Sequence, residues 1–465
     1  MENNRAQWGS KIGFILAAAG SAVGLGNIWK FPGKAFEGGG GAYILIYLAI
    51  VVLIGFPVML SELTIGRAAQ ANAIDSFHKL GYRGFKWVGV TGVAVAFIVT
   101  SYYCHVGGWV LRYVVSYITE AQTVYADPLG YFYGLLGYNA ATGETWFPLT
   151  AILFAAVFMA VNAFIIIKGV EGGIEKFNKV GMPALFVILI VLLARTITLD
   201  GAQVGFAYML SCDWSKVGFN TFLSALGQAF FSLSLGMAIM ITYGSYVKPE
   251  VDLNKSVSQV EFFDTGVALL AGVMIIPAVF VFSGTDGMGV GPSLMFVSLP
   301  KVFDAMGPAG TVVGVLFFIS AIFATLTSCI SVLESIVANC MEIFHTDRKK
   351  TTLVLALIYL AASAVIALGY SVFYFNVTLP NGSSAQLLDI MDYVSNSVMM
   401  PLIALLSTIL IGWVKSPKYV ADEMERGGYK FRRKRMYYVM IRYVAPVMML
   451  VLFLQSTGLL SMIFK

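Results

Sequence analysis

Long apolar stretches recur along the whole of this 465-residue chain. A helix that spans a membrane needs about 20 mostly apolar residues, and eleven segments meet that length. Only 12% of the residues are charged, against roughly 25% in an average soluble domain, so polar residues are too few to cover a soluble globule. The pattern predicts an all-α membrane protein with eleven transmembrane helices. They are expected near 12–36, 41–70, 87–118, 148–167, 177–197, 221–247, 260–283, 309–340, 351–372, 388–414 and 436–463.

Lysine and arginine residues in the short loops predict how the chain is oriented in the membrane. With the N-terminus inside, the inner segments contain the run from Arg348 to Lys350 and the cluster from Lys430 to Arg435. The outer loops contain few basic residues. We therefore expect a multi-pass protein of the plasma membrane with a cytoplasmic N-terminus and an extracellular C-terminus. The net charge of +5 follows from this asymmetry and indicates no nucleic-acid partner.

Two of the predicted helices contain small and polar residues at mid-depth. The first reads Gly-Ser-Ala-Val-Gly-Leu-Gly from Gly20, and the sixth reads Ser-Leu-Ser-Leu-Gly from Ser232. Both are poor helix centres. Small residues also let two helices pack closely, but these two segments come first in successive groups of five spans. That arrangement is typical of inverted-repeat transporters, whose discontinuous helices form a site at mid-membrane.

The two breaks define the expected domain organisation and the chemistry of the site. We expect one transmembrane domain over 1–465, with repeats at 1–200 and 221–414 and an additional helix at 436–463. Unwound backbone is tolerated in a membrane only where it lines a cavity or binds something. Half-helix N-termini favour a carboxylate and freed carbonyls favour a cation. A zwitterionic amino acid with Na⁺ fits both, although a channel constriction would use the same geometry.

A few ionisable residues fall inside the predicted spans, where burial is costly and indicates a role in function. Asp264 has no basic neighbour in sequence, which favours a cation as its partner. We interpret His105 as a packing residue, with a proton relay as the alternative, and Glu334 as a hydrogen-bonding group between helices. Hydroxyls in span eight either bond the carbonyl one turn earlier or complete an oxygen shell for Na⁺. The ionisable residues are Glu62, His105, Asp264, Glu334, Asp389 and Asp392.

Longer motifs are spread over nearly the whole chain. They include Trp8-Gly-Ser-Lys, the run from Ala19 to Pro32, Gly38 to Ala42, Gln228 to Ser234, and Leu326 to Ser328. Together these motifs resemble the neurotransmitter:sodium symporter family. The resemblance implies the leucine-transporter-type fold, a 5+5 inverted repeat with discontinuous helices 1 and 6. Eleven spans rather than twelve are similar to the bacterial branch that takes up hydrophobic amino acids.

The resemblance also implies two sodium sites and a substrate site at the breaks. The first sodium site would consist of Ala22, Asn27, Ser232 and Asp264, with the substrate carboxylate as a further ligand. The second would consist of Gly20, Val23, Ala324, Thr327 and Ser328. The substrate would contact Ala22, Leu25, Gly26, Val99, Tyr103, Phe231, Ser232, Ser234, Met237, Ser328 and Val332.

Gates at either end follow from the same resemblance. Lys30 and Asp392 would close the outer end above Phe231, and Arg5, Tyr246 and Glu342 would close the inner end. Lysine replaces the arginine of many relatives and cannot form the bidentate pair of a guanidinium. Ala238 replaces a common glycine, which we expect to limit the unwinding of span six. Gly173 and Pro183 predict that span five unwinds at its inner end, with an ordinary helix start as the alternative.

The function implied is sodium-coupled symport of hydrophobic aliphatic and aromatic L-amino acids, with two Na⁺ ions. Relatives with a neutral residue near Asp264 require chloride, so this carboxylate predicts chloride independence. An amino-acid-gated channel or receptor is the alternative. A membrane enzyme is disfavoured, because His78, His105 and His345 are dispersed and no nucleophile or metal motif is found.

Overall fold

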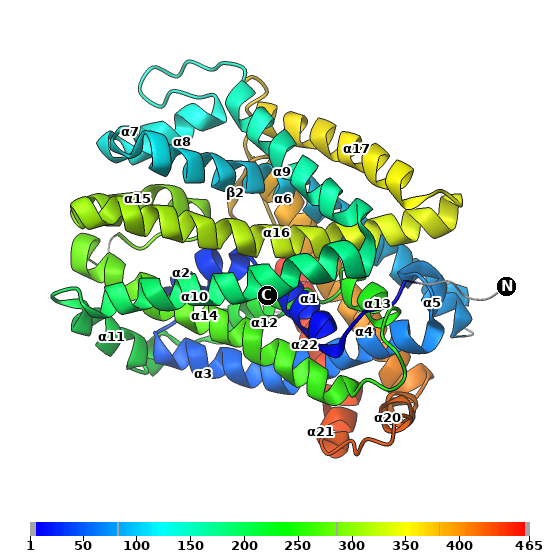
Figure 1. Cartoon of the computed structure of the whole chain (residues 1–465). Helices are drawn as coiled ribbons and strands as arrows, with labels where there is room; N and C mark the ends of the chain where they lie inside the picture. Colours follow the sequence, from blue (N-terminus) through cyan, green and yellow to red (C-terminus); the bar gives the residue numbers. More distant parts are fainter. Residues whose placement is uncertain (1–5, 81–82, 285–286, 381, 461–465) are drawn as a thin grey trace.

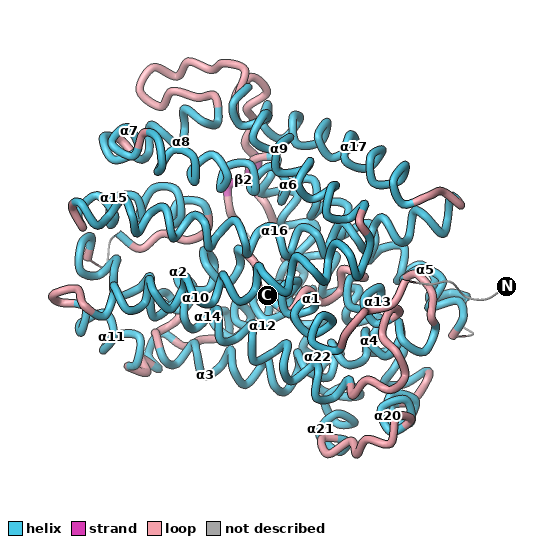
Figure 2. The backbone as a smooth tube through the Cα atoms, viewed as in Figure 1, coloured by secondary structure: helices cyan, strands magenta, loops and turns pink. Residues whose placement is uncertain are grey.

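The computed structural model of the chain describes residues 6–80, 83–284, 287–380 and 382–460. These residues are mainly helical, and their one sheet pairs β1 (Val377–Thr378) with an antiparallel β2 (Ser384–Ala385). Long helices lie side by side, with loops mainly at the two ends of the bundle (Figures 1 and 2). We call the end that carries residue 6 and α5 the inner end, and the opposite end the outer end.

The first half of the chain contains predicted spans one to five and their connections. Its α-helices are α1 (Lys11–Ala22), α2 (Phe31–Glu37), α3 (Gly41–Ile50), α4 (Phe56–Ala69), α5 (Ala73–Lys79), α6 (Lys86–Thr119), α7 (Ala121–Ala126), α8 (Pro128–Leu136), α9 (Leu149–Ile167), α10 (Lys176–Ile197) and α11 (Ala202–Leu210). Its π-helical and 3₁₀ turns are η1 (Gly26–Lys30), η2 (Val51–Gly55), η3 (Arg83–Phe85), η4 (Val170–Glu175) and η5 (Trp214–Lys216).

The second half contains predicted spans six to eleven. Its α-helices are α12 (Phe219–Ser232), α13 (Ile239–Gly244), α14 (Leu253–Ser283), α15 (Leu299–Ala305), α16 (Pro308–Phe344), α17 (Arg348–Gly369), α18 (Leu387–Asp392), α19 (Met400–Ile409), α20 (Pro417–Glu425), α21 (Lys434–Val439) and α22 (Ala445–Ser456). Its π-helical turns are η7 (Leu294–Ser298), η8 (Tyr393–Met399), η9 (Leu410–Val414) and η10 (Met440–Val444).

In the described residues, the eleven predicted spans are found as nine single helices, one bent pair of helices and one interrupted helix. By length and apolar composition, nine helices of the described residues can cross a membrane, and a tenth span is the pair formed by α1 with η1 and α2, bent by 46°. Span six is not one continuous helix, because residues 233–238 separate α12 from α13. Both interruptions therefore fall where small and polar residues predicted them.

The interrupted helices lie in the interior of the bundle, where long helices hold them. α1 packs against α10, α14 and α16, and α13 packs against α4 (Figure 1). Glycine permits the second contact: a Cβ at Gly244 would lie 2.3 Å from the Leu63 carbonyl oxygen, and one at Gly66 would lie 1.8 Å from that of Ile241. The inner half of span six thus packs directly against the backbone of span two.

Candidate functional site

Span one breaks at Val23, whose φ of −74° and ψ of 102° lie outside the helical region. Side chains then hold two of the freed backbone amides. Gly24 N donates to Asn27 Oδ1 at 3.1 Å, and Leu25 N donates to Tyr103 Oη on α6 at 3.2 Å. The unwound turn is therefore fixed by its own asparagine and by span three.

Span six unwinds through three residues in the left-handed conformation, Ser234, Gly236 and Ala238, with φ of 54°, 73° and 60°. Glu62 holds this turn, because its Oε1 accepts a hydrogen bond from Gly236 N at 2.8 Å. A left-handed backbone costs about 1–2 kcal/mol for a residue with a Cβ. Ala238, which was expected to limit the unwinding, is the last of these three residues, and α13 begins directly after it.

Asp264 on α14 connects the two breaks. Its carboxylate accepts hydrogen bonds from Asn27 Nδ2 at 2.8 Å, Ser232 Oγ at 2.7 Å and Tyr47 Oη at 3.3 Å. The residue is fully buried, and none of the ion pairs found among the described residues includes it. A buried carboxylate with only neutral donors retains a charge that a small cation would stabilise.

A second group of oxygen atoms lies between α1 and α16. Ser328 Oγ lies 3.2 Å from the Gly20 carbonyl oxygen and 3.0 Å from that of Val23, and Thr327 Oγ1 lies 3.1 Å from the Ala324 carbonyl oxygen. The single Ser328 hydroxyl proton cannot satisfy both carbonyls at once. Lone pairs on these carbonyl oxygens therefore remain available to a hard cation, which prefers oxygen ligands.

A central cavity of about 30 Å³ lies between the breaks. Its walls are apolar at Val99, Met237 and Val332 and polar where backbone is unwound. Every residue expected to contact substrate lines it except Leu25, whose amide bonds the lining residue Tyr103. The lining residues are Ser21, Ala22, Gly24, Gly26, Asn27, Val99, Tyr103, Phe231, Ser232, Ser234, Met237, Ser328 and Val332.

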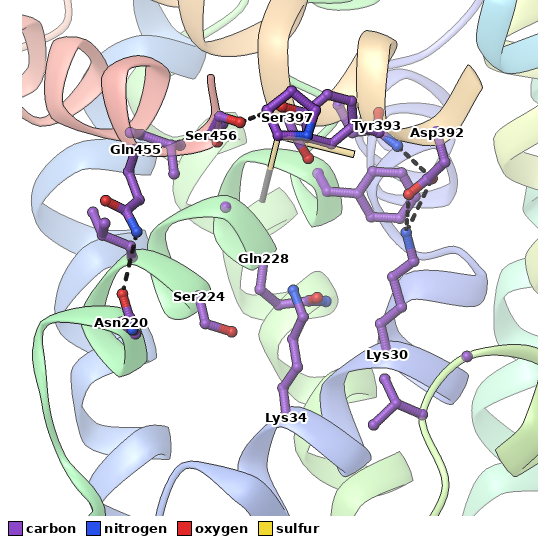
Figure 3. Close-up of a pocket in the computed structure, with 18 of the residues that line it drawn as sticks. Lys30, Lys34, Asn220, Ser224, Gln228, Asp392, Tyr393, Ser397, Gln455 and Ser456 are labelled. Carbon is purple, nitrogen blue, oxygen red and sulfur yellow. Dashed lines mark hydrogen bonds and ion pairs between the residues drawn. The ribbon is translucent and has the colours of Figure 1, made fainter. Parts of the chain in front are cut away.

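An outer vestibule of about 580 Å³ lies beyond Phe231, which lines both cavities. Lys30 and Asp392 both line it and are in direct contact (Figure 3), with Lys30 Nζ 3.1 Å from both carboxylate oxygens. The same nitrogen lies 4.5 Å from the centroid of the Phe231 ring. Tyr102 and Asn396 also donate to Asp392. The structure thus brings together the three residues expected at the outer gate: Lys30, Phe231 and Asp392.

The inner end is closed by a buried network around Glu334. This carboxylate accepts hydrogen bonds from Tyr246 Oη at 2.8 Å and from Arg348 Nη2 at 2.9 Å, and its side chain is completely buried. Trp8 Nε1 donates to the Tyr243 carbonyl oxygen at 3.1 Å, which fixes the segment before α1 to α13. The interpretation of Glu334 as an interhelical hydrogen-bonding group matches these contacts.

Two other residues were expected at the inner gate. Glu342 Oε2 accepts hydrogen bonds from Asn72 Nδ2 at 2.7 Å and from its backbone N at 3.1 Å. Arg5 lies outside the described residues. The sequence had indicated no role for Asn72.

Glu175 attaches the N-terminal segment to the inner end of span five. It accepts hydrogen bonds from Gly9 N at 2.8 Å and Ser10 Oγ at 2.7 Å, and Lys179 Nζ lies 2.7 Å from it. Its helix is wound here: η4 runs directly into α10, which continues through Pro183. The unwinding predicted from Gly173 and Pro183 is therefore absent from this conformation.

Comparisons with known proteins agree with this geometry. The model of the sodium:neurotransmitter symporter family matches residues 5–124 and 136–462. The chain is 36% identical to the sodium-dependent transporter YhdH of Bacillus subtilis over 99% of both chains. It is 32% identical to a sodium-dependent transporter of Methanocaldococcus jannaschii over 88% of this chain and 82% of that protein. The crystal structure of MhsT in complex with L-phenylalanine superposes with a TM-score of 0.85, at 38% identity, covering 97% of this chain and 100% of MhsT.

Two interrupted helices around a central cavity, with separate closures at either end, define a secondary transporter and not an enzyme. The chain belongs to the sodium:neurotransmitter symporter family. It is a multi-pass, sodium-dependent symporter with the leucine-transporter-type fold seen in MhsT.

Proposed function

We propose that this symporter imports hydrophobic L-amino acids, both aliphatic and aromatic, by alternating access. The observation that carries the proposal is the central cavity, which offers apolar walls for a side chain next to unwound backbone for a zwitterion. A charged side chain among Val99, Met237 and Val332 would be buried without a partner, which is costly. The bound L-phenylalanine of MhsT supports the same substrate class.

The unwound turns suit the two charged ends of an amino acid. The substrate carboxylate would contact the amides near Leu25 and Gly26 and the hydroxyl of Tyr103. Because Tyr103 Oη accepts its bond from Leu25 N, its own proton is available to that carboxylate. The ammonium group would face carbonyl oxygens near Phe231 and Ser234.

Two Na⁺ ions would accompany each substrate. One would bind among Ala22, Asn27, Ser232 and Asp264 together with the substrate carboxylate. The other would bind the second group of oxygens, from Gly20, Val23, Ala324, Thr327 and Ser328. Two charges moving through 100 mV release about 4.6 kcal/mol, enough for accumulation on the order of 10³-fold.

The membrane arrangement is also part of the proposal. The inner end faces the cytoplasm, residues 1–200 and 221–414 form the two repeats, and 436–463 form the additional helix. Arg5 joins Tyr246 and Glu342 at the inner end, while Lys30 and Asp392 close the outer end over Phe231. Substrate would reach the central cavity through the outer vestibule.

Asp264 makes transport independent of chloride, because its carboxylate supplies the negative charge that would otherwise come from the anion. If Asp264 takes up a proton on the empty return step, the cycle also exports a proton. We expect Asp264→Asn to lower the apparent Na⁺ affinity by at least about tenfold, since one charge-assisted ligand is lost, and to abolish any effect of a pH gradient on uptake. Ser232→Ala, which removes a neutral ligand, is the matched control and should have a smaller effect.

Equilibrium binding to the purified protein tests the substrate class. Labelled phenylalanine should bind only with Na⁺, equally well in chloride and gluconate, and leucine, valine, methionine, tyrosine and tryptophan should compete. Glutamate and lysine should not. Competition by the charged amino acids, or binding that requires chloride, would contradict the proposal.

A further inference from the structure

Arg442 lies inside the last membrane span, eight residues from its start. Arg67, Arg112 and Arg348 each form an ion pair with a glutamate. No ion pair found in the described part of the chain includes Arg442, and its side chain is exposed on the surface of the bundle. A charge on the membrane-facing surface of a span is costly and calls for a partner.

Two aromatic rings hold this side chain in place. The guanidinium carbon of Arg442 lies 4.9 Å from the centroid of the Trp413 ring and 5.6 Å from that of Tyr443. Trp413 Nε1 donates to the Arg442 carbonyl oxygen at 2.7 Å. The rings are themselves 55% and 52% exposed. Cation–π contacts of this kind position a cation, but they do not neutralise it.

The backbone beneath Arg442 is also unusual. The π-helical turns η9 and η10 contact each other in spans ten and eleven. A Cβ at Gly412 would lie 2.7 Å from the Ile441 carbonyl oxygen and 3.0 Å from the Arg442 Cα atom. Such π-helical turns occur frequently at functional sites. The close backbone contact fixes the position from which the Arg442 side chain extends.

The position of Arg442 along the last span matches the level of lipid headgroups. It lies about 12 Å beyond Lys434, the first residue of α21, at a rise of about 1.5 Å per residue. Helical side chains tilt toward the helix N-terminus, so a long side chain here reaches back toward the inner end. Further along, the exposed surface is apolar, with Val447 54% and Leu450 44% exposed. The long side chain of Arg442 can therefore reach the level expected for lipid headgroups at the inner end.

We propose that Arg442, oriented by Trp413 and Tyr443, binds the phosphate group of an anionic phospholipid at the inner end. The planar guanidinium can donate two parallel hydrogen bonds to a phosphate. The neighbouring apolar surface accommodates acyl chains and excludes a freely dissolved phosphate ion. This lipid site is separate from the transport site, and only its assignment to the cytoplasmic leaflet depends on the proposed orientation.

Native mass spectrometry of the delipidated full-length protein, titrated with phosphatidylglycerol, tests the site. We expect one preferentially bound lipid, and Arg442→Gln should weaken its binding by about tenfold, the equivalent of one charge-assisted hydrogen bond. Trp413→Leu should weaken it by about threefold through the lost cation–π contact. Arg435→Gln is the matched control, because it removes an equal charge from an exposed position of the same span and should change binding by less than about twofold.

Further measurements distinguish an anionic lipid from other lipids and from free phosphate. Arg442→Lys keeps the charge but loses the planar fork, so we expect intermediate affinity. Phosphatidylcholine should bind more weakly than phosphatidylglycerol, diacylglycerol should not bind at this site, and millimolar inorganic phosphate should not compete. Phosphatidylglycerol should also raise the melting temperature of the wild type more than that of Arg442→Gln. Equal binding by wild type and Arg442→Gln, or an equal loss in Arg435→Gln, would overturn the proposal.

Discussion

The two ends of the substrate pathway are closed in different ways. At the outer end, Lys30 and Asp392 form one ion pair, and their side chains are 21% and 30% exposed. This pair and the Phe231 ring lie at the base of the wide outer vestibule. At the inner end Glu334 is completely buried and joined to Tyr246 and Arg348. Exposed ion pairs contribute about 0–1 kcal/mol, whereas breaking a buried one costs about 3–5 kcal/mol. The outer end should therefore open more readily from this conformation.

The largest effect is expected for Glu334→Gln. The substitution leaves Arg348 facing a neutral side chain in a largely buried place, which should lower the free energy of unfolding by about 3–5 kcal/mol. The melting temperature should fall, and hydrogen–deuterium exchange of residues 8–22 should rise. In the double variant with Arg348→Gln, part of the stability should return, because no unpaired charge remains. An unchanged melting temperature in Glu334→Gln would show that the inner end is not held closed more strongly than the outer end.

An intermediate effect is expected for Glu175→Gln. An amide side chain has one acceptor oxygen where the carboxylate has two, so it cannot accept from both Gly9 N and Ser10 Oγ in the same way. The loss should be about 1–3 kcal/mol, with faster exchange confined to residues 8–22 and the start of span five. Glu171→Gln on the same turn is the control. Equal exchange in the two variants would mean that Glu175 does not tether the N-terminal segment.

The smallest effect on stability is expected for Lys30→Gln, at less than about 1 kcal/mol. Its effect on the substrate should be larger, since loss of the ion pair lets the Phe231 ring move. Labelled phenylalanine should dissociate several-fold faster in the presence of Na⁺. Lys30→Arg should slow dissociation, because a guanidinium can pair with both oxygens of Asp392 through separate N–H groups. A loss of stability as large as in Glu334→Gln would show that both ends are equally strong.

The sequence predicted those parts of the fold that depend on the helix propensity of nearby residues. The breaks fall at Gly- and Ser-containing stretches because these residues weaken a helix wherever they occur. Ala238 is the last residue of the unwound turn, directly before α13, and its effect on the extent of unwinding stays a prediction. Local propensity thus located the unwound turn.

Contacts distant in sequence could not be derived from the residues alone. Lys30 and Asp392 are 362 positions apart, and only the family resemblance suggested that they meet. Tyr47 was missed because a tyrosine in an apolar span looks like a packing residue until its contact with Asp264 is seen. Arg348 and Glu334 are only 14 positions apart, on consecutive helices, so a signal for this pair was present in the sequence.

Coupling of substrate movement to sodium can be measured as concentrative uptake. Proteoliposomes containing the full chain should be given an inward Na⁺ gradient with chloride replaced by gluconate. We expect labelled phenylalanine to accumulate well above its external concentration and to leave again when the Na⁺ gradient is dissipated. Uptake that stops at the external concentration, as a channel would give, or accumulation that fails without chloride, would contradict this expectation.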